Sequence, residues 1–274
     1  MKFLQMGCPL AVKFILICSF LFNLSAEARQ TKVQKRHYTF KLRRWIQLLE
    51  FTFDDNVLQR PLQDVRRREL ERLTGTIASQ LSSKKKKQFL VLFENYWLPF
   101  QKGIKDKAKY LELRKSAFSL FRVVTAPSQI PDFTLGENIY REQCSTCHGE
   151  KGKGDGPFTR NSSYPMNPKP KDLTIQYTEG TRSPFSYFNS IVVGSPGTAM
   201  NSYDKSLTSH EIWSLSFYMS IGWKSGSHPK KDFNLSLDDL SVLTNDEIAR
   251  KFPGPGSIRY ARETLPFEVS TARK

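Results

Sequence analysis

The pentad Cys144-Ser145-Thr146-Cys147-His148 restricts the possible structures of this chain more than any other stretch. Two thiols separated by two residues and followed at once by an imidazole form the attachment pattern of a c-type haem. On a helical turn, each thiol can form a thioether with one of the two vinyl groups of a haem. The next residue then places an imidazole under the iron. The pattern therefore predicts one covalent haem c, attached to Cys144 and Cys147, with His148 as an iron ligand.

Three other uses of the same pentad compete with haem. A structural zinc site takes four ligands, and the remaining histidines are His37, His210 and His228. A thioredoxin-like dithiol belongs to a βαβ context, which no stretch of this chain predicts. A disulfide between Cys144 and Cys147 needs only an oxidising compartment. Haem accounts best for both cysteines and the histidine together.

A haem iron bound to histidine takes a sixth ligand or keeps an open position, and methionine opposite histidine is the usual electron-transfer arrangement. The downstream candidates are Met166, Met200 and Met219. Met200 follows GSPGTA, a stretch of small residues that lets the backbone approach a porphyrin, and it precedes the last helix of its domain. Met219 has the spacing of a helical core residue, and Met166 lies in a proline-rich loop. We expect His148 and Met200 to bind the iron, with Met166 as the second candidate.

The first 28 residues have the pattern of a secretory signal peptide. Lys2 and Lys13 supply positive charge, Phe14–Leu24 is a mostly apolar run, and Ala26-Glu27-Ala28 offers a small-residue cleavage site. The run is too short to span a bilayer, which takes about 20 residues. An uncleaved interfacial anchor is the alternative. We expect cleavage near Ala28 and a periplasmic protein that keeps only the two cysteines of the pentad, with no disulfide framework.

Charge and composition divide the rest of the chain. Residues 29–125 hold 23 Lys and Arg against 9 Asp and Glu, a net charge of +14, whereas residues 126–225 hold 9 of each. At the same point, TAPSQIPDF (Thr125–Phe133) is typical of a linker. We expect a basic helical domain at 29–125, a monohaem domain at 126–225, and a tail at 226–274 with a short helix around Asp238–Phe252.

Apolar residues of 29–125 recur at helical spacing. Two such groups are Trp45, Leu48, Leu49 and Phe53, and Leu111, Phe118, Leu120 and Phe121. The run Lys84–Lys87 is expected to be the solvated start of a helix rather than a recognition motif.

The second domain is predicted to contain three helices. The first leads into the cysteines. The second opens with Ser183-Pro184, an N-cap and a proline in the first turn. The third opens with Thr208 and Glu211, which have the spacing of a capping box. The predicted fold class is therefore all-α.

Four stretches together resemble a class I cytochrome c domain: YREQCSTCHGEKGKGDGP, NPKPKDLT, SPFSYFNSIVVGSPGTAM and LTSHEIWSLSFYM. More narrowly, they are similar to the cytochrome c unit that precedes the permease in some bacterial high-affinity iron permease proteins. RRWIQLLEFTFDDNVLQ and LSLDDLSVLTNDEIARKF resemble the segments on either side of that unit. The resemblance implies an N-terminal helical domain followed by a class I cytochrome c-like helical domain, and it suggests a link to iron uptake.

The resemblance also assigns roles to individual residues. It places the covalent haem on Cys144 and Cys147, and the iron ligands on His148 and Met200. It makes the carbonyl of Pro157 a candidate to accept the ring N–H of His148, which would fix the orientation of the imidazole.

A pair of residues on the first predicted helix receives a packing role from the same resemblance. Gly136 and Tyr140 should lie where the first and last helices of the domain cross. They should face Leu215 and Tyr218 of the last helix.

We therefore expect an electron carrier between redox partner proteins and no catalytic residue, because an iron with both axial positions filled has no open site. A haem enzyme with an open site, such as a peroxidase, is the alternative, and rapid binding of cyanide or carbon monoxide would favour it. A haem-bearing adaptor of a membrane complex is a further alternative, which co-purification with such a complex would favour.

The charge of residues 29–125 predicts docking on an anionic membrane surface or an acidic protein. A basic surface that only maintains solubility is the competing interpretation. Nucleic acid is not an expected partner of an exported protein.

Overall fold

The computed structural model describes residues 34–52, 60–160, 166–174, 183–221, 234–254, 256–264 and 266. The regular elements in these ranges are all helical, which confirms the all-α prediction. The chain divides into two compact units, Met1–Leu42 and Arg43–Lys274, and the tertiary contacts described below lie within the second. The predicted signal peptide at 1–28 lies outside the described residues. The domain boundaries expected near residues 125 and 225 stay predictions.

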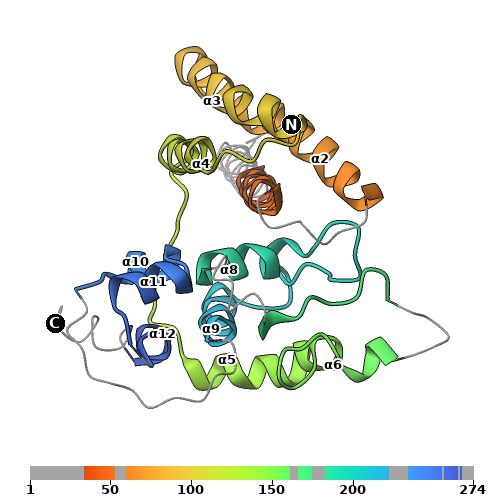
Figure 1. Ribbon diagram of the computed structural model, residues 1–274, viewed down its shortest axis with the longest axis vertical. Helices are drawn as coiled ribbons and strands as arrows, with labels where there is room; N and C mark the ends of the chain where they lie inside the picture. Colours follow the sequence, from red (N-terminus) through yellow and green to blue (C-terminus); the bar gives the residue numbers. More distant parts are fainter. Residues whose placement is uncertain are drawn as a thin grey trace, which may run out of the picture. The chain divides into compact units, whose positions relative to one another are not determined.

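Among the described residues, four helices precede the helical stretch that leads into the pentad (Figure 1). They are residues 34–52, α2 (Arg60–Ala78), α3 (Ser83–Gln101) and α4 (Lys107–Phe121). Trp45 is fully buried, with its ring centroid 5.4 Å from that of Phe89 in α3. Its indole Nε1 donates a hydrogen bond of 2.8 Å to Thr74 Oγ1 in α2. An aromatic core therefore joins the first helix, α2 and α3.

The start of α3 agrees with the prediction, because Lys84–Lys87 lies exposed in its first turns. Helix α4 covers the helically spaced group that begins at Leu111. Within this helix, Leu111 is 46% exposed, whereas Leu113 and Ala117 are buried. Successive helical residues are about 100° apart, so Leu111 points well away from the Leu113 face.

After α4, a continuous helical stretch ends at the pentad. α5 (Phe133–Ile139) leads through a π-helical turn (Tyr140–Cys144) into α6 (Ser145–His148). Helices α8 (Pro184–Val193) and α9 (Ser209–Ser220) follow.

Both predicted helix starts are confirmed. The side chain of Ser183 accepts a hydrogen bond from the backbone N–H of Ser186, and Pro184 occupies the first helical position. Thr208 and Glu211 form the complete capping box at the start of α9.

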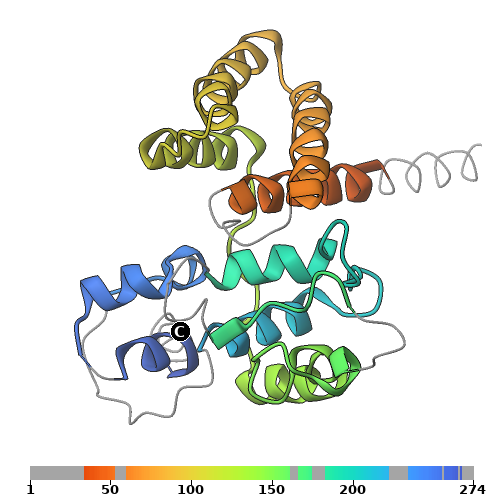
Figure 2. The same ribbon diagram turned by 45° about the vertical axis from the view of Figure 1, so that its right-hand side comes forward.

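Helix α9 packs between α8 and α5, as Figures 1 and 2 both show. The backbones of α5 and α9 approach closely at Gly136, where an added Cβ would lie 2.3 Å from the carbonyl oxygen of Ser214. One turn further on, the ring centroids of Tyr140 and Tyr218 are 5.6 Å apart. The crossing of the first and last helices at Gly136 and Tyr140 is therefore confirmed.

The C-terminal segment forms α10 (Leu237–Val242), α11 (Asn245–Lys251), α12 (Ser257–Arg259) and a π-helical turn (Tyr260–Thr264). The single helix expected around Asp238–Phe252 is thus two helices. The chain breaks between them because Thr244 forms a capping box of its own with Glu247.

A buried arginine ties this segment together. Arg262, which is 1% exposed, donates to the carbonyl oxygens of Leu240 and Leu243 at the end of α10 and to Asn245 Oδ1. Asn245 Nδ2 in turn donates to the carbonyl of Ser220 at the end of α9 (2.7 Å). The segment after α9 is therefore packed on that helix through a polar network. None of the helices in the described ranges has both the length and the apolar character that a membrane crossing requires.

Candidate haem-binding site

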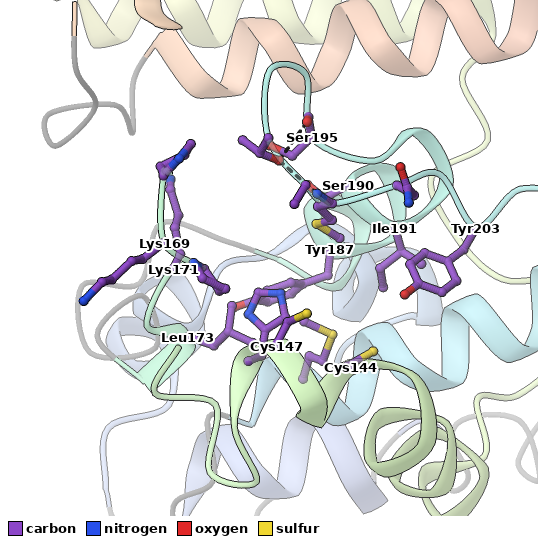
Figure 3. A pocket seen from close by; sticks show the side chains of 18 of the residues that line it. Cys144, Cys147, Lys169, Lys171, Leu173, Tyr187, Ser190, Ile191, Ser195 and Tyr203 are labelled. Carbon is purple, nitrogen blue, oxygen red and sulfur yellow. Dashed lines mark hydrogen bonds between the residues drawn. The ribbon is translucent and has the colours of Figure 1, made fainter. Parts of the chain in front are cut away.

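A cavity of about 310 Å³ lies over the pentad. Its volume falls in the range of ligand pockets, roughly 300 to 1,000 Å³. The four predicted site residues, Cys144, Cys147, His148 and Met200, all line it. Figure 3 shows the two cysteines on one side of the cavity, on the helical stretch that ends at the pentad, and Ser195 on the opposite side.

The local backbone explains how the pentad is presented. Cys144 ends a π-helical turn, a feature often found at functional sites, and Cys147 and His148 lie in α6. The glycine-rich loop after His148 then folds back on α6. Gly149 has a φ of +78°, and a Cβ at Gly156 would lie 2.3 Å from the carbonyl oxygen of Thr146. Glycine at these positions lets the loop close tightly behind the pentad.

The thiols lie in an environment that suits thioethers better than thiolates. Burial raises the pKa of Cys144 to about 12, and it also raises the pKa of Cys147. A redox dithiol acts as a thiolate, so this environment disfavours that alternative. In the described ranges there is also no group of three or more His, Cys, Asp and Glu side chains that could hold another metal ion.

Burial lowers the pKa of the His148 imidazole, with a backbone hydrogen bond at Lys171 acting in the opposite direction. A lowered pKa favours the neutral ring, which is the form that binds metals. The Nδ1 of His148 is buried and has no hydrogen-bond partner in the described part of the chain. The predicted bond from Nδ1 to the Pro157 carbonyl was therefore wrong. The loop is instead held by the N–H of Gly156, which donates to the carbonyl of Cys147 (3.2 Å).

All three candidate methionines, Met166, Met200 and Met219, line the cavity. Met219 is 5% exposed and lies in α9. Met200 lies in a closed turn, because its carbonyl accepts a bond from the N–H of Ser195 (3.0 Å) and its N–H donates to Thr198 Oγ1 (3.2 Å). The assignment of Met200 as the second iron ligand stays a prediction.

The sequence did not reveal several lining residues. Tyr203 follows Met200 by three positions, and its hydroxyl donates to the carbonyl of Gln143 beside the pentad (3.2 Å). The closeness of Tyr203 to Met200 in the sequence is a signal that could have identified Tyr203 as a lining residue. Gln47, Phe51 and Arg66 also line the cavity, but they belong to the preceding helices and carry no local motif.

The residues present fit a c-type haem. Two thiols, one imidazole and three thioethers face a single cavity, and the rest of its lining combines apolar and aromatic side chains with polar ones. The lining also contains Arg66, Lys169 and Lys171, which suit an anionic group such as a haem propionate.

Comparison with known proteins agrees with this geometry. Residues 133–223 match the cytochrome c family. Among solved structures, the chain is similar to the Kuenenia stuttgartiensis reducing HAO-like protein complex Kustc0457/Kustc0458, at 25% identity and a TM-score of 0.32. That match covers 43% of this chain and 62% of the other, which is less than two thirds of the relative, and it is too weak to bear on fold or function. A comparison with curated proteins found no match. The C-terminal part of this chain contains a cytochrome c domain.

Proposed function

We propose that this chain is an exported cytochrome that carries one electron between redox partner proteins through a single covalent haem c. His148 and Met200 are the proposed iron ligands. The main support is that these two residues and both cysteines of the pentad line one cavity, within the part of the chain that matches the cytochrome c family.

A c-type haem supplies the one-electron chemistry, and the residues of this chain hold and tune it. Cys144 and Cys147 would anchor the porphyrin, and the imidazole of His148 would bind the iron. The closed turn at Met200 presents a thioether, a ligand that raises the reduction potential relative to histidine. Apolar and aromatic side chains in the wall, such as Leu173 and Ile191, exclude water and disfavour the extra positive charge of the oxidised state.

Covalent attachment is the first test. Acidified organic solvent should leave the haem on the wild-type polypeptide and remove it from the double variant Cys144→Ser/Cys147→Ser. The matched control is Ser145→Ala/Thr146→Ala, which alters the residues between the cysteines and should keep the haem bound. Complete extraction of haem from the wild-type protein would show that the attachment is not covalent.

The proposal of an electron carrier differs from the enzyme alternative in ligand exchange. With Met200 on the iron, carbon monoxide and cyanide should bind slowly, because the methionine must leave first. Rapid binding to the untreated protein would favour a haem enzyme with an open site.

We further propose that the mature chain acts in the periplasm and that residues 29–125 dock it onto an anionic surface. The match of residues 133–223 to the cytochrome c family and the signal-peptide pattern of residues 1–28 support export. The net charge of +14 on residues 29–125 against zero on residues 126–225 supports the docking. A link to iron uptake is a hypothesis based on the resemblance to iron permease proteins. Iron accumulation by cells lacking this chain, compared with complemented cells, tests that link.

A further inference from the structure

Part of the wall of the haem cavity comes from outside the cytochrome c domain. Gln47 in the first helix donates from Nε2 to the carbonyl of Gly194 (2.7 Å), and Arg66 in α2 donates from Nη2 to Ser195 Oγ (3.0 Å). Both acceptors lie in the turn that leads to Met200. A Cβ at Gly197 in the same turn would lie 2.4 Å from Leu62 Cδ1 of α2. The two preceding helices therefore pack directly against the turn that carries the proposed iron ligand.

Arg66 brings a buried positive charge to this wall. The residue is 5% exposed, and its Cζ lies 4.2 Å from the ring centroid of Phe51. Lys171, from the cytochrome c domain, has its Nζ 5.5 Å from the same centroid. Two cations from separate parts of the chain thus meet at one aromatic ring beside the cavity.

The charged side chains among the described lining residues are all positive. The lining of the cavity in the described residues contains Arg66, Lys169 and Lys171 and no Asp or Glu. The planar guanidinium of arginine matches a carboxylate particularly well, and lysine binds anions as a point charge. A ligand that carries carboxylates would therefore meet three cations on this wall.

The cations lie on the side where such carboxylates are expected. A haem carries its two vinyl groups on one edge and its two propionates on the opposite edge, and the cysteines bind the vinyl edge. Figure 3 shows Lys169 and Lys171 at one side of the cavity and Cys144 and Tyr203 at the other. Arg66 belongs to the lysine side, since it shares the ring of Phe51 with Lys171.

We propose that Arg66 of α2 forms an ion pair with a haem propionate, so that the helices preceding the cytochrome c domain complete its haem site. Lys171 assists from within the domain. This inference rests on the proposed function, because it requires a haem bound through Cys144 and Cys147. It makes the helical part of the chain a component of the redox centre in addition to any docking role.

The test compares Arg66→Gln with Arg68→Gln in the full mature chain carrying its haem. Arg68 lies on the same helix, is exposed and does not line the cavity, so the two variants lose the same charge. Removing a cation near the iron favours the oxidised state. Arg66→Gln should therefore lower the equilibrium constant for reduction about tenfold, which is about 59 mV for a one-electron couple. Arg68→Gln should leave it nearly unchanged, and Arg66→Lys should restore most of the wild-type value.

A second readout separates ion pairing from a general structural role. Loss of the guanidinium raises the pKa of a paired carboxylate, so the pH range in which the midpoint potential falls with rising pH should move upward in Arg66→Gln. If Arg66→Gln does not fold, Lys171→Gln, at a half-buried position, should produce a smaller shift of the same sign in both readouts.

The outcomes are distinguishable. Attached haem with the same potential and pH profile in Arg66→Gln and Arg68→Gln overturns the ion pair and leaves the proposed function intact. If Lys171→Gln is measured in place of Arg66→Gln, a midpoint potential and a pH profile equal to those of the wild type also overturn the proposed ion pair. Absence of covalent haem from the wild-type protein would instead overturn the proposed function.

Discussion

Among single residues, the three methionines around the cavity differ in how the backbone holds them. Hydrogen bonds through Ser195 and Thr198 close the turn at Met200, so its side chain can bind iron without ordering a loose segment. Met219 is presented by a rigid helix, where it is buried among core residues. Met166 lies in a proline-rich stretch. These differences favour Met200 as the ligand and make Met166 a matched control.

Replacing Met200 by alanine should abolish the weak iron–sulfur charge-transfer absorbance of the oxidised protein. It should also lower the midpoint potential, since a methionine ligand raises it. Absorbance spectroscopy and redox titration of Met200→Ala and Met166→Ala measure both effects. Met166→Ala should resemble the wild type, and the assignment is wrong if Met166→Ala loses the absorbance while Met200→Ala keeps it.

At the scale of helices, the crossing of α5 and α9 supports the site, because α5 leads directly into the pentad. The crossing depends on the absence of a side chain at Gly136, where an added Cβ would lie 2.3 Å from a backbone oxygen of α9. Backbone atoms cannot move aside as a flexible side chain can. Any larger residue must push the two helices apart.

Gly136→Ala should therefore lower the free energy of unfolding by about 1 to 3 kcal/mol, the usual cost of overpacking. Gly75→Ala in α2 is the control, because an added Cβ there meets nothing within 4 Å. That change should raise the free energy of unfolding by about 0.5 to 1 kcal/mol, since alanine favours helix over glycine. Denaturant unfolding of both variants measures the two effects. Equal shifts of one sign would contradict the tight crossing.

Over the whole molecule, charge is distributed unevenly between the parts of the chain. Residues 29–125 carry a net charge of +14, and residues 126–225 carry none. The exposed run Lys84–Lys87 at the start of α3 contributes to this charge. A positive domain of this kind attracts anionic surfaces. This attraction weakens as salt is added, because the Debye length falls to about 10 Å at an ionic strength of 0.1 M.

Lys84→Gln/Lys85→Gln should weaken binding to vesicles of phosphatidylcholine and phosphatidylserine about tenfold or more at low salt, at about 1 kcal/mol per basic residue. The control is Lys151→Gln/Lys153→Gln, which removes the same charge from two exposed positions of the cytochrome c domain. A vesicle sedimentation series across salt concentrations measures both. Docking through residues 29–125 is contradicted by equal losses in the two variants or by binding that does not respond to salt.

Local sequence was sufficient for the features that involve neighbouring residues. The pentad and the helix starts at Ser183 and Thr208 each depend on groups within four positions of one another, so their chemistry can be read directly. The small residue at Gly136 was identified through resemblance to a family, and the structure supplied the reason, a close approach of two backbones.

What depended on packing between distant segments could not be predicted. Leu111 and Leu113 are both apolar, and only the position of α4 against its neighbours decides which is buried. The bond expected from His148 to the Pro157 carbonyl is not formed. The N–H of Gly156 instead donates to the carbonyl of Cys147, a contact that no motif encodes. By itself, the sequence determined an all-α chain with a haem-attachment pentad and a basic N-terminal part. Only the tertiary structure decided that Gln47, Phe51 and Arg66 line the cavity, because a pocket wall is made where separate helices meet.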